Sequence, residues 1–179
     1  GPTDDDLGYW VKFNYTKTSE AFPWSSPGGN KAQHTLGKYS YDEDQAALYT
    51  IGNKELFYLN SIETKTHIAE FHTSNRADSK AQGSKTLQKL DRIELYSKKD
   101  KNYYSDGYPT PLKTVHFNYD YSLTSGVFDF DSSQQNVDEP GTGKLTLKQL
   151  WFTYRNSNKG ELTPYEFDYN THDSDGNEF

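Results

Sequence analysis

Aromatic side chains that recur at every second position constrain the fold of this chain more than any other feature. The first such row comprises Tyr9, Val11, Phe13 and Tyr15. A period of two places alternate side chains on one face of a β-strand. Similar rows occur in stretches 112–121, 144–154 and 165–169, whereas no stretch keeps a helical period over ten residues. The sequence therefore predicts an all-β fold with little or no helix.

The remaining patterns predict how these strands are ordered. Stretch 55–71 favours β-structure and is expected to break near Asn60–Ser61, as two strands or one bent strand. Stretch 74–85 is polar, with a short helix over 79–89 as the alternative. Strands over 87–97 and 112–121 should form a hairpin. Stretch 144–154 carries apolar residues on both sides and is the expected central strand. Together these features predict an antiparallel meander, either a sandwich or an open curved sheet.

Composition limits the domain organisation and the partners. The 179 residues fit one domain, and aromatic residues at 16% must supply much of its burial. Gly1–Pro2 resembles a tag remnant and Met is absent, so residues 3–179 are expected to be a single β-rich domain cut from a larger protein. The net charge of −7, without a basic cluster, argues against nucleic acid. The apolar stretches are too short for membrane insertion.

Four segments in the C-terminal half share a recognisable cadence of apolar and aromatic positions. They are Leu90–Tyr96, Lys113–Tyr119, Lys144–Tyr154 and Leu162–Tyr169, followed by the step Asp173-Ser174-Asp175-Gly176-Asn177. Over about residues 87–179 this cadence resembles SpvB-like and toxin-complex B-component proteins, which are relatives of the Rhs or YD-repeat shells. The resemblance implies a piece of a very large bacterial secreted or surface protein, in which β-sheet regions enclose, carry or display something else. It implies no catalytic residue in this segment.

Histidines and carboxylates give weak evidence for a reactive site. The histidines are His34, His67, His72, His116 and His172, and no two have the helical spacing of a zinc pair. His116, Asn118 and Asp120 share one strand face, where a solvated polar surface is favoured over an ion site.

There is no Gly-x-Ser-x-Gly motif, and nothing singles out a carboxylate pair for glycoside hydrolysis. We therefore expect no catalytic residue and no cofactor. The absence of Cys excludes disulfides and thiolate metal sites, and it suits an exported protein.

Exposed aromatic rings are the most usable functional hint. Phe22 and Trp24 lie in a Pro/Gly-rich stretch, 22–30, predicted to be a surface loop. Tyr103, Tyr104 and Tyr108 lie in a second predicted turn region. Such rings stack on sugars or anchor a protein surface, and the alternative is that they fold back over an aromatic core. A weak calcium candidate comprises Asp173, Asp175 and Asn177, in a segment similar to the first half of a calcium loop.

These observations favour a non-catalytic structural or interaction module of a large secreted or cell-surface, toxin-like bacterial protein. Its expected partners are neighbouring segments of the parent protein. The alternative is a carbohydrate-binding module that uses the loop aromatics. A third hypothesis is a glycan-active enzyme with an acidic cleft.

Overall fold

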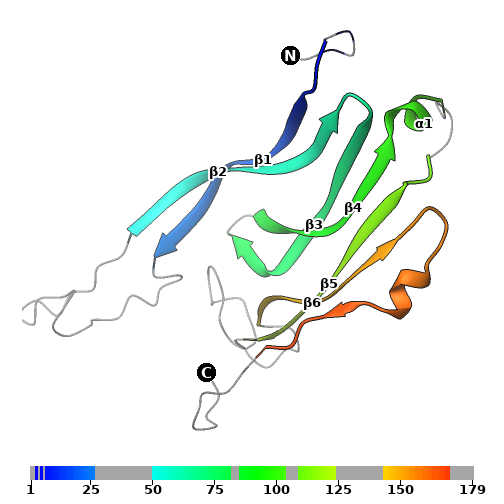
Figure 1. Ribbon diagram of the computed structural model, residues 1–179. Helices are drawn as coiled ribbons and strands as arrows, with labels where there is room; N and C mark the ends of the chain where they lie inside the picture. Colours follow the sequence, from blue (N-terminus) through cyan, green and yellow to red (C-terminus); the bar gives the residue numbers. More distant parts are fainter. Residues whose placement is uncertain are drawn as a thin grey trace, which may run out of the picture.

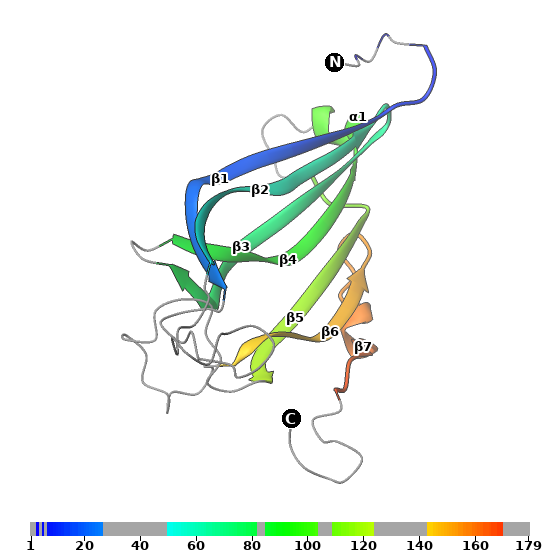
Figure 2. The same ribbon diagram turned by 90° about the vertical axis from the view of Figure 1, so that its left-hand side faces the viewer.

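The computed structural model contains a single curved sheet whose strands follow one another in chain order (Figures 1 and 2). It describes residues 3, 5, 7–26, 50–81, 85–103, 109–123 and 143–169. The seven strands form the order β1-β2-β3-β4-β5-β6-β7, and every neighbouring pair is antiparallel. The predicted all-β antiparallel meander is confirmed, in its open curved form.

The elements are β1 (Val11–Ser26), β2 (Thr50–Thr64), β3 (His67–Ala81), β4 (Lys85–Ser97), α1 (Lys98–Tyr103), β5 (Lys113–Leu123), β6 (Lys144–Thr153), η2 (Lys159–Leu162) and β7 (Tyr165–Glu166). Helical structure in the described residues is limited to the short α1 and the 3₁₀ turn η2. The sequence also allows a short strand over residues 38–41 and predicts a polar excursion over 122–143. Residues 38–41 and 124–142 lie outside the described residues.

Strand β1 is longer than the sequence predicts and includes the first residues of the expected loop. It pairs with β2 from Val11↔Thr64 to Ser26↔Thr50, so the loop prediction for residues 22–26 is wrong. Pro23 is tolerated because β1 is an edge strand of the described sheet and its register is broken by bulges, which are the places where a missing N–H costs least.

The turn between β2 and β3 lies at Lys65 and Thr66, not near Asn60–Ser61 as predicted. Thr64 stabilises this turn, because its hydroxyl accepts a hydrogen bond from the His67 backbone N–H over 3.1 Å. Asn60 interrupts the apolar pattern without ending the strand. The register moves from Asn14↔Ser61 to Tyr15↔Leu59, so Asn60 is the extra residue of a β-bulge inside β2.

The polar residues 75–81 continue β3 and β4 begins at Lys85, so the helix alternative over 79–89 is wrong. The distal end of β3 is held by Asp78, which is 3% exposed and accepts two hydrogen bonds from Arg76. Asp78 Oδ2 also accepts a bond from the Leu145 backbone N–H at the start of β6, over 3.0 Å. The Ala77 N–H donates to the Tyr121 hydroxyl on β5. Tertiary contacts thus override the polar composition and tie the end of β3 to β5 and β6.

The C-terminal half follows the predicted meander with one correction. Strands β4 and β5 pair as expected, with Arg92 opposite His116, although α1 lies in their connection. Strand β6 is not central, since it is sixth of seven strands and its outer neighbour β7 has two residues. The apolar residues on both sides of its alternating pattern are explained by a β-bulge. Lys148 is the extra residue, so Leu147 pairs with Tyr119 and lies on the same face as Leu150.

Pairing across the sheet assigns the side chains to two faces of opposite character, because directly opposed residues project to the same side. The apolar face comprises Phe13, Ile62, Ala69, Phe71, Ile93, Leu95, Val115, Phe117, Leu150, Phe152 and Tyr165. The polar face comprises Lys12, Asn14, Ser61, Glu63, Glu70, His72, Arg92, Glu94, Thr114, His116, Asn118, Gln149, Thr153 and Glu166, and it also carries Ile68, Tyr96 and Trp151.

Candidate functional site

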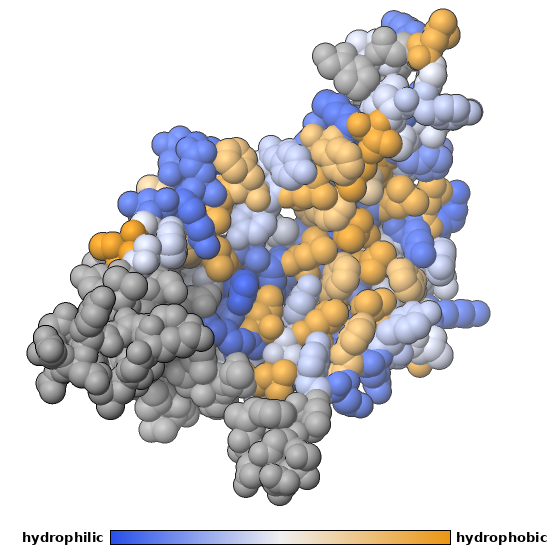
Figure 3. Space-filling model, turned by 60° about the vertical axis from the view of Figure 1, so that its left-hand side comes forward, coloured by the Kyte–Doolittle hydropathy of each residue, from blue (hydrophilic) through white to orange (hydrophobic). Residues whose placement is uncertain are grey.

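The apolar face is solvent-exposed. Each of its side chains is at least partly accessible, with Phe13 at 54% and Tyr165 at 62%. Among the described residues, the buried hydrophobic side chains are Phe22 and Tyr96, and neither belongs to this face. Figure 3 shows apolar side chains gathered over one side of the sheet. A sheet of this kind normally buries its apolar face against a second layer.

The polar face, in contrast, has satisfied much of its bonding within the sheet. Ser61, Thr114 and Thr153 are buried there. Asn14 Nδ2 donates to the Ser61 hydroxyl over 2.9 Å and to Glu63 Oε1 over 2.5 Å. Hydrogen bonds between side chains of neighbouring strands make this face a laterally connected polar layer.

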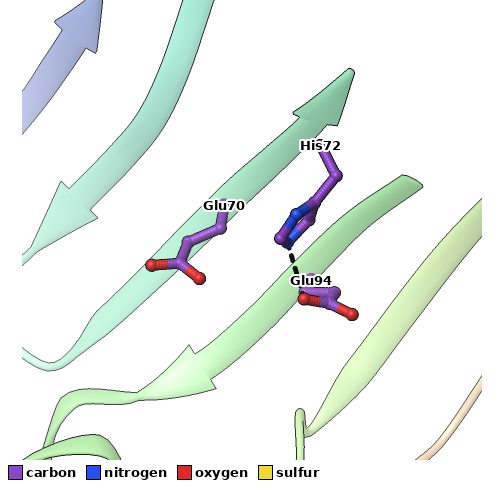
Figure 4. Close-up of side chains that lie close together, drawn as sticks. All are labelled: Glu70, His72 and Glu94. Atoms are coloured by element: carbon purple, nitrogen blue, oxygen red, sulfur yellow. Dashed lines mark ion pairs between the residues drawn. The ribbon is translucent and has the colours of Figure 1, made fainter. Parts of the chain in front are cut away.

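The densest cluster on the polar face is formed by Glu70, His72 and Glu94 (Figure 4). Glu70 and His72 are two residues apart on β3, and Glu94 lies directly opposite Glu70 on β4. The ligating atoms of the three side chains lie within 4.8 Å of one another. His72 Nε2 is 2.6 Å from Glu94 Oε2, an ion-pair contact that does not meet hydrogen-bond geometry.

Glu94 is the electrostatic centre of this cluster. Burial alone would raise the pKa of Glu94, but hydrogen bonds from Arg92 and Tyr96 outweigh burial and hold the pKa below its usual value. The Arg92 Nε–H donates to Oε1 and the Tyr96 hydroxyl to Oε2, each over 2.9 Å. Burial, followed by the bond to the Glu94 carboxylate, raises the pKa of Tyr96 far above its ordinary value. Glu94 is therefore a carboxylate and Tyr96 a neutral phenol at neutral pH.

The positions of these three side chains fit one divalent cation, but their charge partners do not favour it. Lys101 on α1 forms an ion pair with Glu70, and Arg92 forms one with Glu94. A bound ion would have to replace both cations of the protein. The lowered pKa keeps Glu94 ionised, so Glu94 is unsuited to the role of the protonated acid in glycoside hydrolysis. The chemistry of the cluster is that of a structural ion-pair network.

His116, Asn118 and Asp120 do share a strand, but they make separate contacts. The His116 ring stacks on Trp151 with centroids 5.0 Å apart, and its Nε2 is 2.9 Å from the Thr153 hydroxyl. Burial, followed by the Arg92 charge, lowers the pKa of His116. Asn118 and Asp120 instead line an open hollow of about 360 Å³ between β5, β6 and the segment around β7.

The described aromatic residues that were predicted to bind a ligand lie in regular elements and not in loops. Phe22 lies on β1 and is 5% exposed, beneath the Lys54 ammonium. Trp24 is 37% exposed and lies across Gly52, where a Cβ atom would come within 2.9 Å of its Nε1. Tyr103 is the last residue of α1. The Tyr103 side chain, Tyr104, Tyr108 and the calcium candidates Asp173, Asp175 and Asn177 lie outside the described residues.

Sequence reasoning did not find the Glu70, His72 and Glu94 cluster or the hollow. Glu70 and His72 are separated from Glu94 by more than twenty positions, and only the register of β3 with β4 brings them together. The spacing Glu70-x-His72 was a usable signal, since residues two apart on a strand share a face. The hollow depends on the bulge at Lys148, which a strict alternation of residues does not reveal.

Neither helix in the described part of the chain has the length and apolar character needed to cross a membrane. Comparison with protein-family models, with curated proteins and with solved structures finds no match to this chain.

Proposed function

We propose that this chain is a non-catalytic structural or interaction module of a large secreted or cell-surface bacterial protein. Its role is to pack the apolar face against a neighbouring segment of that protein. The supporting observation is the exposed apolar face, which extends over all seven strands. The toxin-like, YD-repeat-related parent and its location are supported by the cadence of the strands in the C-terminal half.

The chemistry of the apolar face favours another apolar β-layer as its occupant. Two cations on this face are already engaged. Lys113 lies opposite Leu95 and is 4.0 Å from the centroid of the Phe152 ring. Lys17 lies opposite Phe57 and forms an ion pair with Glu55 over 2.8 Å. A charged or strongly polar partner would thus find few groups to pair with. Two sheets that pack face to face lie about 10 Å apart and interdigitate their alternating side chains. Covering a side chain such as Phe13 contributes roughly 1 kcal/mol, since about half of it is already shielded.

Single-cysteine labelling tests this proposal, because the chain contains no native Cys. Phe117→Cys reports on the apolar face, and Asn118→Cys is the matched control on the opposite face. A maleimide is applied to each variant in the isolated chain and in the longer polypeptide that contains it. We expect both thiols to react in the isolated chain, and the thiol at position 117 alone to be protected in the longer polypeptide.

Two results would overturn the proposal. One is equal reactivity of the thiol at position 117 in the isolated chain and in the longer polypeptide. The other is protection already in the isolated chain together with a dimeric mass by light scattering, which would assign the apolar face to a second copy of the same chain.

A further inference from the structure

The hollow between β5, β6 and β7 is the concave polar site in the described part of the molecule that the structural role leaves unexplained. Its volume is about 360 Å³, and its lining includes Asn118, Gln149 and Glu166 of the polar face together with Tyr119. It lies at the bulge in β6, where Lys148 is the extra residue. Bulges redirect side chains and are frequent beside binding sites.

The floor of the hollow is a row of hydrogen-bonded side chains from three adjacent strands. Asn118 lies opposite Gln149, and Gln149 lies opposite Glu166. The Asn118 Nδ2 group donates to Gln149 Oε1 over 3.3 Å, and the Gln149 Nε2 group donates to Glu166 Oε1 over 3.2 Å. Each side chain is therefore oriented by its neighbour before any ligand arrives, which reduces the entropy lost on binding.

This row keeps both donors and acceptors available for a ligand. An amide side chain has two N–H donors and an oxygen with two lone pairs, and a carboxylate has two oxygens. The bonds within the row use one N–H of Asn118, the oxygen and one N–H of Gln149, and one oxygen of Glu166. The second N–H of each amide and the second carboxylate oxygen remain. A ligand group that both donates and accepts, such as a hydroxyl, matches this arrangement.

Charge narrows the choice of ligand. The carboxylates of Asp120, Glu166 and Asp168 line the hollow together with one ammonium, that of Lys148. The resulting negative charge disfavours phosphates, uronates and other anions. Among the described residues these carboxylates do not form a group close enough to share one metal ion, unlike the cluster at Glu70. A neutral, hydroxyl-rich ligand remains.

An aromatic wall completes the site. Phe167 lines the hollow, and its backbone N–H donates to the Lys148 carbonyl over 2.9 Å, which fixes this segment against β6. Tyr169 follows on the same segment, is 42% exposed and anchors its hydroxyl on the Leu147 carbonyl over 2.8 Å. Phe167 thus provides an aromatic side chain among the residues that line the hollow, beside the polar row.

From this geometry we infer that the hollow binds a neutral sugar ring, with the Asn118, Gln149 and Glu166 row bonding its hydroxyls and Phe167 contacting its C–H face. The volume is at the lower end of the range for ligand sites, as a small saccharide requires. The inference is independent of the proposed packing of the apolar face, because the row of Asn118, Gln149 and Glu166 belongs to the polar face.

The test is an NMR titration of the isotope-labelled chain with glucose, galactose, mannose and N-acetylglucosamine. Glucuronic acid and spermidine serve as charged comparators. We expect at least one neutral sugar to shift the backbone amides of residues 118–120, 148–149 and 166–168. Gln149→Ala should weaken its affinity about tenfold, the equivalent of one or two lost hydrogen bonds. Asn14→Ala removes a bonded amide from the far end of the same face and should leave the affinity unchanged.

The inference is overturned if no neutral sugar shifts these amides, if glucuronic acid or spermidine binds in preference, or if Asn14→Ala weakens binding as much as Gln149→Ala. The dispersion of the spectrum reports whether each variant is folded. If Gln149→Ala is unfolded, Glu166→Gln takes its place, since it keeps the shape of the row and removes an acceptor charge. Unchanged sugar affinity in that folded variant would also overturn the inference.

Discussion

Removing the Asp78 carboxylate should destabilise the sheet more than any other single change to a charged side chain described above. Asp78 is buried, and Arg76 donates to it from Nε over 2.9 Å and from Nη2 over 2.5 Å. The Leu145 N–H is its third donor, so the same carboxylate connects the end of β3 to the start of β6. Asp78→Ala deprives all three donors of their acceptor.

The expected loss follows from the burial of each partner. Breaking a buried, hydrogen-bonded ion pair costs about 3 to 5 kcal/mol. The Arg76 side chain is 22% exposed, so water replaces part of what it loses, and the lower limit of about 3 kcal/mol applies. Asp78→Asn keeps an acceptor oxygen and should cost about half as much. Asp168→Ala, at an exposed position, is the control and should change the free energy of unfolding by less than about 0.5 kcal/mol.

The pH dependence provides an independent check. Burial would raise the pKa of Asp78, but the bonds from Arg76 and Leu145 outweigh it and lower the pKa below 3.8. A lowered folded-state pKa gives stability that is complete above the unfolded pKa, near 3.9, and is lost as pH falls through the folded value. The difference in the free energy of unfolding between the native chain and Asp78→Asn should therefore be constant near neutral pH and become smaller in acid.

Urea unfolding followed by tryptophan fluorescence measures these differences at several pH values. The reasoning is refuted if Asp78→Ala lies within about 1 kcal/mol of the native chain at neutral pH, since the loss of a buried acceptor of three bonds cannot be so small. It is also refuted if the gap between the native chain and Asp78→Asn widens as the pH falls.

Three further outcomes are expected. Gly143→Ala should cost about 1 to 3 kcal/mol in urea unfolding, because its Cβ would lie 2.1 Å from the Tyr121 carbonyl oxygen; an unchanged midpoint would contradict this close contact. Glu94→Gln should destabilise the chain by about 1 to 2 kcal/mol at neutral pH, and the difference should vanish as pH falls through the lowered pKa of Glu94, as acid titration of unfolding can show. Phe117→Asp should reduce binding of an apolar fluorescent dye while changing the unfolding free energy by less than Gly143→Ala does; undiminished dye fluorescence would place the accessible apolar surface elsewhere.

The sequence predicts those strands whose alternation is uninterrupted. Residues 113–121 alternate without a break and form β5, and the early aromatic row marks β1. Prediction fails where long-range contacts decide the structure. Polar residues after position 74 continue β3 because Asp78 accepts a bond from Leu145 on β6 and the Ala77 N–H donates to Tyr121 on β5. These distant partners are invisible to local propensity.

β-Bulges explain the other differences between the predicted and the observed strands. Asn60 is accommodated inside β2 as an extra residue, so a local polar break does not end the strand. Lys148 reverses the parity of β6, so apolar residues on both sides of the pattern reach one face of the sheet. The candidate sites depend on the same register information. Glu70 meets Glu94, and Gln149 meets Glu166, only after each strand is paired at a defined offset.

The contrast between the two faces leads to the function proposed here. On the polar face, Glu94 has three partners and Glu70 is paired with Lys101, so these partly buried charges already have partners within the sheet. On the apolar face, side chains such as Phe117 and Phe152 still meet solvent. Apolar burial is the main free-energy term that favours a folded sheet. Covering the exposed apolar face would therefore stabilise this sheet further. A partner that supplies a second apolar layer would stabilise the sheet, and it would do so without competing for the polar row of the hollow, which belongs to the opposite face.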